Sequence, residues 1–200
     1  MKNNNQYLTA LPLLGMSRFI AMFLLLCSLS AQATAPRINA GLFGEETKAD
    51  VVGYQSRPMA ANTKSESALT VEIVTEAFNA AGKSVVVDIL PSNQLAKYAL
   101  VNNDATALIG IHGDLTGQES SQYRVVTFYL RVTPLGEEPI SLIFSKKNSR
   151  GDELHQAFTE GLQKIIKSGK YMEILEKHLG KGHVPTDYER RLRRSNPSLK

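Results

Sequence analysis

The chain has 200 residues, one cysteine, no tryptophan and a formal net charge of +4 at pH 7. A chain of this length buries roughly 70% of the surface that its unfolded form exposes, so one packed core is enough and no disulfide framework is needed. Lys and Arg exceed Asp and Glu only toward the two ends of the chain, which argues against a nucleic-acid-binding body.

Residues 1–33 have the pattern of a secretory signal peptide. Lys2 and Arg18 precede a short apolar run over 19–30, and the A-x-A pattern that ends at Ala33 fits cleavage after that residue. The apolar run is too short to cross a hydrocarbon layer of ~30 Å comfortably, so an uncleaved anchor is the weaker alternative. We therefore expect export from the cytoplasm, with no permanent membrane span after cleavage.

Cleavage after Ala33 would leave a mature chain without cysteine. Cys27 itself is not expected to carry a lipid, because Leu26 precedes it where a lipoprotein signal has a small residue. The mature chain has a formal charge of +2, since two cations leave with the leader. Residues 181–200 alone carry +4, so the body carries −2. We expect this basic tail to be mobile or peripheral, with contact to anionic lipid or an acidic partner as the alternative.

Hydrophobic periodicity divides the mature chain into helices and strands. Helices show apolar residues at three- and four-residue spacing, whereas short β-branched runs predict buried strands. In chain order we expect a strand at 37–43, a polar loop at 45–64 with room for a short strand at Val51-Val52, a helix at 69–81, a strand buried on both faces at 84–90, a helix after Ser92, a second buried strand at 105–111, strands at 124–132 and 139–146, and helices that begin near Asp152 and Tyr171. Gly161 should weaken the helix that begins near Asp152 by ~1 kcal/mol relative to alanine.

The strands at 84–90 and 105–111 are expected to lie parallel, joined by a right-handed helical crossover. Ligands of such sheets collect at the carboxyl ends of the strands. The first strand is followed by Ser92–Gln94, where free N–H groups at a helix start favour anions, although these residues are also ordinary caps. The second ends around Gly110 and His112, where glycine lets a ligand approach the backbone; the alternative is an ordinary strand end.

Two further residues have side chains suited to a ligand. Tyr54 can stack on or hydrogen-bond a solute from the long loop, or simply anchor that loop. Arg124 can hold a carboxylate through two parallel hydrogen bonds, with a surface ion pair as the alternative. The candidate ligand-binding residues are therefore Tyr54, Ser92, Asn93, Gln94, Gly110, His112 and Arg124.

Motifs for catalysis or metal binding are scarce. The sequence contains no HExxH, no Walker sequence, no G-x-S-x-G and no GxGxxG, and its four histidines do not have metal-ligand spacing. The paired acidic residues at 45–46 and 137–138 fit solubility better than acid–base chemistry. We expect no catalytic residue, metal or cofactor.

Three segments of the sequence together resemble a known family. They are the strand end and proline at Leu90–Gln94, the helix-to-strand passage at Leu100–Gly110, and the closing helical phrase at Ser168–Gly180. In these phrases the chain, over about 37–185, resembles the periplasmic solute-binding proteins of ABC importers, in particular the amino-acid-binding family often called family 3. Gln94 stands where many relatives carry arginine, and Ser92 where they carry an aromatic residue.

The resemblance implies an α/β fold of the type II periplasmic-binding-protein kind, with a mixed, mostly parallel sheet flanked by helices and a C-terminal helical pair. It also implies a periplasmic protein that binds a small polar solute and meets an inner-membrane permease or sensor. Only 131–139 separate the two strands that resemble the hinge, so the second lobe is missing and closure on a ligand is not expected. The expected parts are a signal peptide (1–33), a single-lobe domain (34–180) and a basic tail (181–200).

Two other functions remain open. The face left by the missing lobe can dock a second copy or a membrane sensor, which would make the chain an interaction module that forms an oligomer. This fold also hosts periplasmic dehydratases, for which His112 is the main candidate residue.

Overall fold

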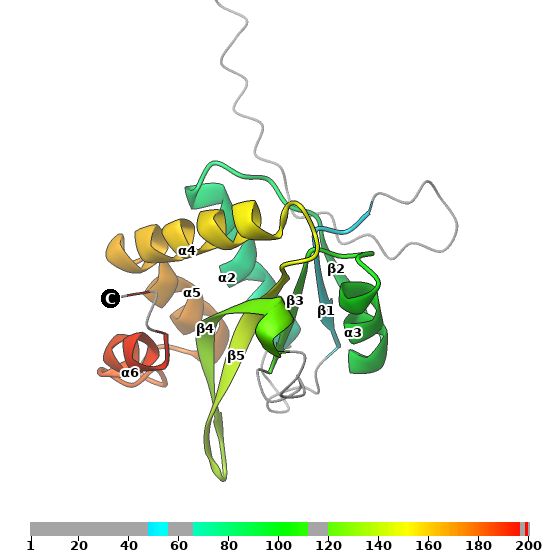
Figure 1. The fold of residues 1–200 in the computed structure, drawn as a ribbon. Helices are drawn as coiled ribbons and strands as arrows, with labels where there is room; N and C mark the ends of the chain where they lie inside the picture. The colour runs from blue at the N-terminus through cyan, green and yellow to red at the C-terminus, as the bar shows by residue number, and fades with distance from the viewer. Residues whose placement is uncertain (1–47, 56–65, 112–119, 197–198, 200) are drawn as a thin grey trace, which may run out of the picture. The chain divides into compact units, whose positions relative to one another are not determined.

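The computed structural model describes residues 48–55, 66–111, 120–196 and 199, all within the unit Pro36–Lys200 (Figure 1). The predicted signal peptide, the strand predicted at 37–43 and His112 lie outside these residues. The elements in chain order are β1 (Val51–Tyr54), α2 (Glu66–Ala80), β2 (Val87–Leu90), α3 (Asn93–Val101), β3 (Ala107–Ile111), the 3₁₀ turn η2 (Ser120–Gln122), β4 (Tyr123–Thr133), β5 (Gly136–Ser145), α4 (Gly151–Lys167), α5 (Lys170–Leu179) and α6 (Tyr188–Ser195).

The five strands form one mixed sheet in the order β2-β1-β3-β5-β4. β1 pairs in parallel with both β2 and β3, while β5 is antiparallel to β3 and to β4, so four of the five strands point the same way. The expected mixed, mostly parallel sheet is confirmed. The small strand expected at Val51-Val52 is β1, an interior strand that separates the two strands that the sequence suggested as neighbours.

The prediction that 84–90 forms a strand buried on both faces was wrong. β2 is an edge strand, it is limited to Val87–Leu90, and all four of its residues are partly exposed. A run of β-branched residues shows that a strand is favoured, but it does not show whether a neighbour pairs with each side.

Helices cover both faces of the sheet, with α2, α4 and α5 on one side of the strands and α3 on the other (Figure 1). On one face α2, α4 and α5 pack over the larger core, where Phe158 contacts Phe78, Phe128 and Phe144 with ring centroids 5.4, 5.7 and 6.1 Å apart. On the other face α3 is the one helix among the described residues, and it packs with Ala96 and Leu100 buried. The expected C-terminal helical pair is α4 and α5, which Gly169 separates with a φ of +82° that favours glycine.

Gly161 is the point at which α4 crosses α2. A Cβ atom built on this glycine would lie 1.7 Å from the carbonyl oxygen of Ala77 on α2. The expectation that glycine merely weakens the helix was therefore wrong, because the missing side chain is what lets the two helices approach.

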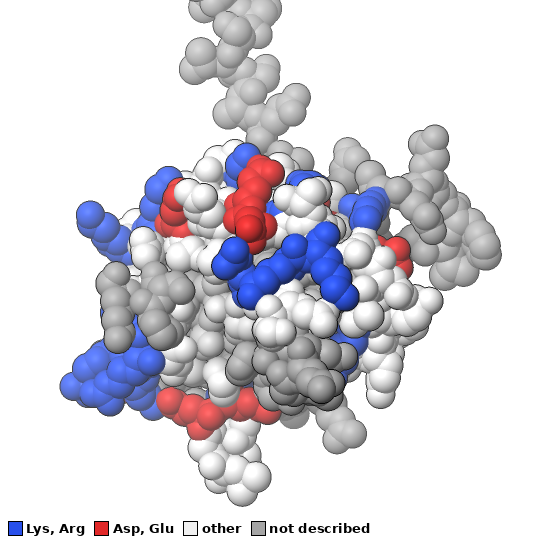
Figure 2. Space-filling model, in the orientation of Figure 1, with Lys and Arg blue, Asp and Glu red and all other residues white. Residues whose placement is uncertain are grey.

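The basic tail is not peripheral, since much of it packs against the outer edge of the sheet. In α6, Tyr188 and Leu192 are buried, and the Tyr188 hydroxyl donates to Leu130 O (3.2 Å) and accepts from Leu130 N (2.7 Å). Asn196 Nδ2 donates to Thr127 O at 2.8 Å. These side chains satisfy outward backbone groups of the edge strand β4 and so block its pairing with another chain. The arginines of α6 belong to the blue cluster at the lower left of Figure 2.

β4 and β5 form a hairpin that extends beyond the end of β3. β3 ends at Ile111, opposite Ile140, and the hairpin continues from there to a tight turn at Pro134-Leu135. The Thr133 hydroxyl fastens this turn by donating to Gly136 O at 2.9 Å. The strands that resemble the hinge therefore turn straight back into the same sheet, which confirms the single lobe.

Candidate functional site

The candidate site lies at the carboxyl edge of the sheet, which is the side where its parallel strands end. β1, β2 and β3 are parallel, so their carboxyl ends at Tyr54, Leu90 and Ile111 share this edge. The chain leaves β1 and β2 here to enter α2 and α3, whose N-termini at Glu66 and Asn93 therefore lie at the same edge. Helix N-termini present free N–H groups and partial positive charge, which is why ligands of open α/β sheets collect at such edges.

A hollow of about 30 Å³ lies between the start of α2 and the hairpin. It is lined by residues of α2, the central strands and the hairpin, namely Tyr54, Glu66, Ser67, Thr70, Ile109, Gly110, Arg131 and Ile140. Drug-sized ligands need ~300–1,000 Å³, whereas a single water needs only ~10–15 Å³. The hollow therefore has room for one small polar group and not for a whole amino acid.

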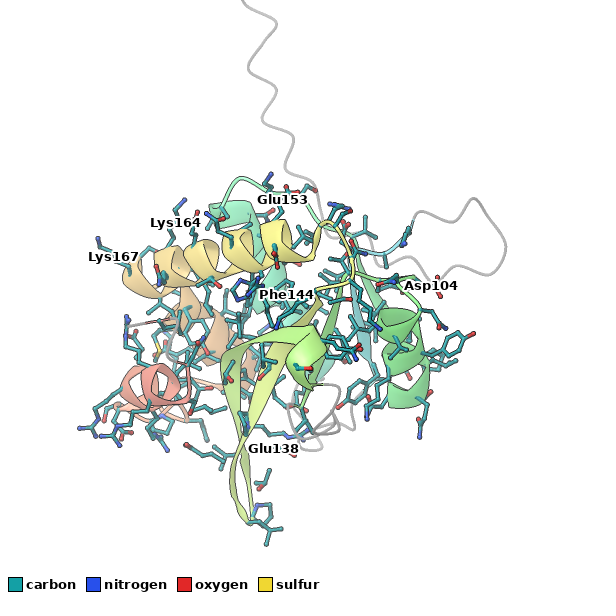
Figure 3. The ribbon with its side chains drawn as sticks, viewed as in Figure 1. Asp104, Glu138, Phe144, Glu153, Lys164 and Lys167 are labelled. Carbon is teal, nitrogen blue, oxygen red and sulfur yellow. The ribbon has the colours of Figure 1, made fainter. Side chains whose placement is uncertain are left out.

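Two charged side chains, Glu66 and Arg131, line this hollow, and Arg131 also pairs with Glu138 of the hairpin. Arg131 Nη1 donates to Glu66 Oε2 at 2.9 Å, and Arg131 Nε donates to Glu138 Oε2 at 2.9 Å, with Nη2 donating to the same Glu138 oxygen. Figure 3 labels Glu138 on the hairpin. Burial raises the pKa of Glu66, and Arg131 offsets part of that rise. Burial and the nearby Glu66 carboxylate raise the pKa of Tyr129 to about 12.

The structure brings only some of the predicted ligand-binding residues together. Tyr54 and Gly110 line the hollow. Ser92, Asn93 and Gln94 lie at the same edge but beside α3, where the Ser92 hydroxyl caps the helix by accepting from Leu95 N at 3.3 Å. Ser92 thus has the capping role that the sequence left as an alternative. The dehydratase alternative depends on His112, which is outside the described residues.

Arg124 is at the opposite edge of the sheet. The register places it across from Phe144, which in turn faces Ala107 at the beginning of β3. Its Nε and Nη2 donate to the two carboxylate oxygens of Asp152 at 2.6 and 3.2 Å. The hydrogen bond from Arg124 lowers the pKa of Asp152. Arg124 therefore forms the surface ion pair that was the alternative, and it does not join the hollow.

Sequence reasoning missed Glu66, Arg131 and Glu138. Glu138 was assigned to solubility, and Arg131 was placed in the strand at 124–132 without a functional role. The available signal was the short link at 133–136: a two-residue turn there places Arg131 directly opposite Glu138 in an antiparallel pair.

His155 of α4 should make the free energy of unfolding depend on pH. Its ring packs edge-on against Phe144, with centroids 5.4 Å apart, and Figure 3 labels Phe144 beneath α4. Burial lowers the pKa of His155, the charge of Arg124 adds to this, and Asp152 opposes it. The folded chain thus binds this proton less readily than the unfolded chain. The free energy of unfolding should therefore fall as the pH drops through 6.5, and should be unaffected by this group well above that pH.

Urea denaturation at about pH 7.5 and about pH 5.5 measures this effect. The pH dependence should be smaller in His155→Gln than in the wild type, whereas the exposed His183→Gln should keep it. Equal dependence in wild type and His155→Gln would contradict the assignment.

No protein-family model matches the sequence, and no curated protein matches it. Among solved structures, the chain is similar to the arginine-, lysine-, histidine-binding protein ArtJ from Geobacillus stearothermophilus, with a TM-score of 0.50 and 15% identity over 73% of this chain and 100% of that one. It is also similar to the GluR0 ligand-binding core from Nostoc punctiforme (TM-score 0.46, 9% identity, 65% of this chain and 98% of that one). The probable amino-acid ABC transporter extracellular-binding protein ytmK from Bacillus subtilis gives a TM-score of 0.44 and 9% identity over 68% of this chain and 100% of that one.

The first of these comparisons supports the fold that the sequence implied. The chain has an α/β fold similar to that of ArtJ. Within the described ranges no helix is both long and apolar enough to span a bilayer. Those same ranges contain no group of three or more His, Cys, Asp or Glu side chains that could hold a metal ion.

Proposed function

We propose that the chain is a periplasmic solute-binding-like protein. It holds a small polar solute, an amino acid or another carboxylate, at the carboxyl edge of β1, β2 and β3, for uptake or sensing through an inner-membrane permease or sensor. The observation that carries the proposal is the hollow at this edge, where the start of α2 meets Tyr54 and the ion pair of Glu66 with Arg131. The fold, whose ligands characteristically collect at strand ends, supports the same place.

The single lobe determines the affinity and the release rate that we expect for such binding. The hollow holds one functional group, so the rest of the solute would lie on an open surface with water on one side. No second lobe closes over it, and the gain in affinity that comes from enclosing a ligand is absent. We therefore expect weak binding with fast release rather than tight capture.

Replacement of Tyr54 with alanine should weaken binding several-fold. Tyr54 provides the largest side chain on the strand side of the hollow, and its loss would remove both apolar contact area and a hydroxyl. Calorimetric titration of the mature protein with the common L-amino acids and with succinate measures the effect.

Tyr98→Ala is the matched control, because Tyr98 is 66% exposed on α3 and does not line the hollow. It should leave the binding constant unchanged. If none of these solutes produces heat or a thermal shift with the wild-type protein, the solute-binding function is wrong.

A second candidate function is association with a second copy of the chain. α3 has an exposed apolar stripe, with Leu95, Tyr98 and Val101 exposed by 51, 66 and 51% at three-residue spacing. The stripe lies beside β2, which has no strand on its outer side among the described residues and can pair there with another β2. Size-exclusion chromatography with light scattering distinguishes a monomer from a dimer, and a strict monomer would remove this candidate.

A further inference from the structure

The helix α6 has one face against the sheet and one face toward solvent. Tyr188 and Leu192 are buried against the outer edge of the sheet and attach the helix. Arg190, Arg193 and Arg194 are exposed, and their three- and four-residue spacing puts them together on the other face. The attached helix therefore presents three guanidinium groups side by side to its surroundings.

The acidic residues nearby do not neutralise this face. Asp187 pairs with Arg190, Nη2 to Oδ2, at 3.0 Å. Arg193 and Arg194 have no acidic partner among the described residues. Residues 187–195 together have a formal charge of +2, whereas the body of the mature chain is negative. The face is thus a local site of positive charge on a lobe that otherwise repels anions.

The chemistry of the face suits phosphate groups. A guanidinium binds phosphate oxygens through parallel N–H donors, which is why arginine is common where phosphates are recognised. An open hollow of about 530 Å³ lies along the face, within the ~300–1,000 Å³ that small-molecule sites have. It is lined by Thr186, Asp187, Glu189, Arg190, Arg193 and Arg194. The hollow has room for a phospholipid headgroup.

The β4–β5 hairpin adds exposed apolar side chains beside the arginines. Arg191 of α6 pairs with Glu137 of the hairpin, so the two elements are neighbours, and Figure 1 shows both toward the lower end of the lobe. Leu135 at the tip is 100% exposed, and Val132 is 69% exposed. Cations next to an apolar tip are typical of proteins that bind at a membrane interface. An acidic polypeptide would use the cations but has no need of the tip.

We propose that α6 and the hairpin tip form a docking surface for an anionic membrane, made by Arg190, Arg193, Arg194 and Leu135. The arginines bind the phosphates of anionic phospholipids, and Leu135 enters the boundary between headgroups and acyl chains. The proposal goes beyond solute binding and does not depend on it, because it concerns where the protein is held.

Vesicle binding tests the surface in the mature protein. Sucrose-loaded vesicles of phosphatidylcholine with about 30 mol% phosphatidylglycerol should bind the protein and carry it into the pellet. Vesicles of phosphatidylcholine alone should bind it at least about tenfold more weakly. Raising the salt concentration from about 0.05 M to about 0.5 M should weaken binding to the anionic vesicles at least about tenfold, because salt screens exposed charges.

The double variant Arg193→Gln/Arg194→Gln tests the arginines. Its binding to the anionic vesicles should weaken at least about tenfold, since each cation near such a surface contributes about fivefold. Lys147→Gln/Lys167→Gln is the matched control, because it removes two exposed cations from outside α6 and lowers the net charge equally. It should stay within about twofold of the wild type. Equal losses in both double variants would show that net charge alone causes the binding, and would overturn the docking surface.

Leu135→Ser tests the tip without changing any charge. It should weaken binding to the anionic vesicles about fivefold, and a fully exposed site leaves the fold intact. It therefore keeps the proposal testable if the arginine variant does not fold. Poly-L-glutamate represents an acidic protein partner. If the wild type binds it as tightly as the anionic vesicles, and Leu135→Ser binds those vesicles like the wild type, the partner is an acidic polypeptide and the membrane proposal is wrong.

Two further results would contradict the docking surface. They are equal binding to the anionic and the neutral vesicles, and wild-type binding by Arg193→Gln/Arg194→Gln. Neither result affects the proposed solute-binding function, because these arginines lie outside the hollow at the carboxyl edge. Solute titrations of the arginine variant should accordingly match those of the wild type.

Discussion

Replacement of Gly161 with alanine is expected to lower the free energy of unfolding by about 3 kcal/mol. In an exposed helix interior, alanine instead of glycine normally stabilises the helix by ~1 kcal/mol. A loss of stability in Gly161→Ala would therefore be due to packing and not to helix propensity. The new methyl group would meet the Ala77 carbonyl oxygen at 1.7 Å and the carbonyl carbon at 2.6 Å. Both atoms belong to the backbone of α2 and cannot turn aside, so α2 and α4 must separate over the main core.

Urea denaturation followed by far-UV circular dichroism measures this loss, as a lower midpoint at an unchanged slope. Lys167→Ala is the control, since Lys167 is an exposed residue of the same helix (Figure 3). It should change the stability by less than about 0.5 kcal/mol. A Gly161→Ala protein that is as stable as the wild type would show that the crossing of α2 and α4 is looser than the structure has it.

Tyr188→Phe is expected to cost about 2 kcal/mol, although it removes a single oxygen atom. The hydroxyl hydrogen-bonds both the N–H and the carbonyl of Leu130 in a buried setting, and phenylalanine would leave these two backbone groups without that partner. Tyr98→Phe is the control, because Tyr98 is exposed and loses only a solvated hydroxyl. Equal unfolding midpoints for the two variants would contradict the role of Tyr188.

Removal of residues 188–200 should have a second consequence besides lower stability. It would uncover the buried outer side of β4, and light scattering should then detect self-association, because an uncovered edge strand is a template for another chain. A truncated protein that stays monomeric would show that the tail does not protect this edge.

The fold could be predicted well because its signals are local. Apolar spacing located α2, α4 and α5, and β-branched runs located β3, β4 and β5, each to within a few residues. The pairing of strands was less accessible. β1 contributes only four residues to the sheet, and nothing in a stretch that short shows that two parallel neighbours will enclose it.

The misjudged features all depend on contacts between distant segments. Gly161 is informative only once Ala77 is known to face it, and the role of Tyr188 appears only beside Leu130. A polar, arginine-rich tail looks solvated in sequence because its few apolar residues, Tyr188, Leu192 and Leu199, are spread among charges. In the fold these three residues are buried, together with Asn196.

The candidate site could be predicted only in part. The rule that ligands collect at strand ends selected Tyr54 and Gly110, and both of them line the hollow. It could not select Glu66 or Arg131, because their meeting depends on how far the hairpin extends past β3. Arg124 had the right chemistry for a carboxylate, but its strand begins at the opposite edge.

The tip of the β4–β5 hairpin is a point at which the lobe should tolerate an insertion. Leu135 is fully exposed, and the turn around it is held by its own Thr133 hydroxyl rather than by the core. Lengthening a surface turn costs little free energy, since each doubling adds only about 0.6 kcal/mol. A whole domain spliced in between Thr133 and Gly136 would thus leave the sheet and its helices undisturbed, and it would emerge from the same hairpin that contributes Arg131 and Ile140 to the hollow.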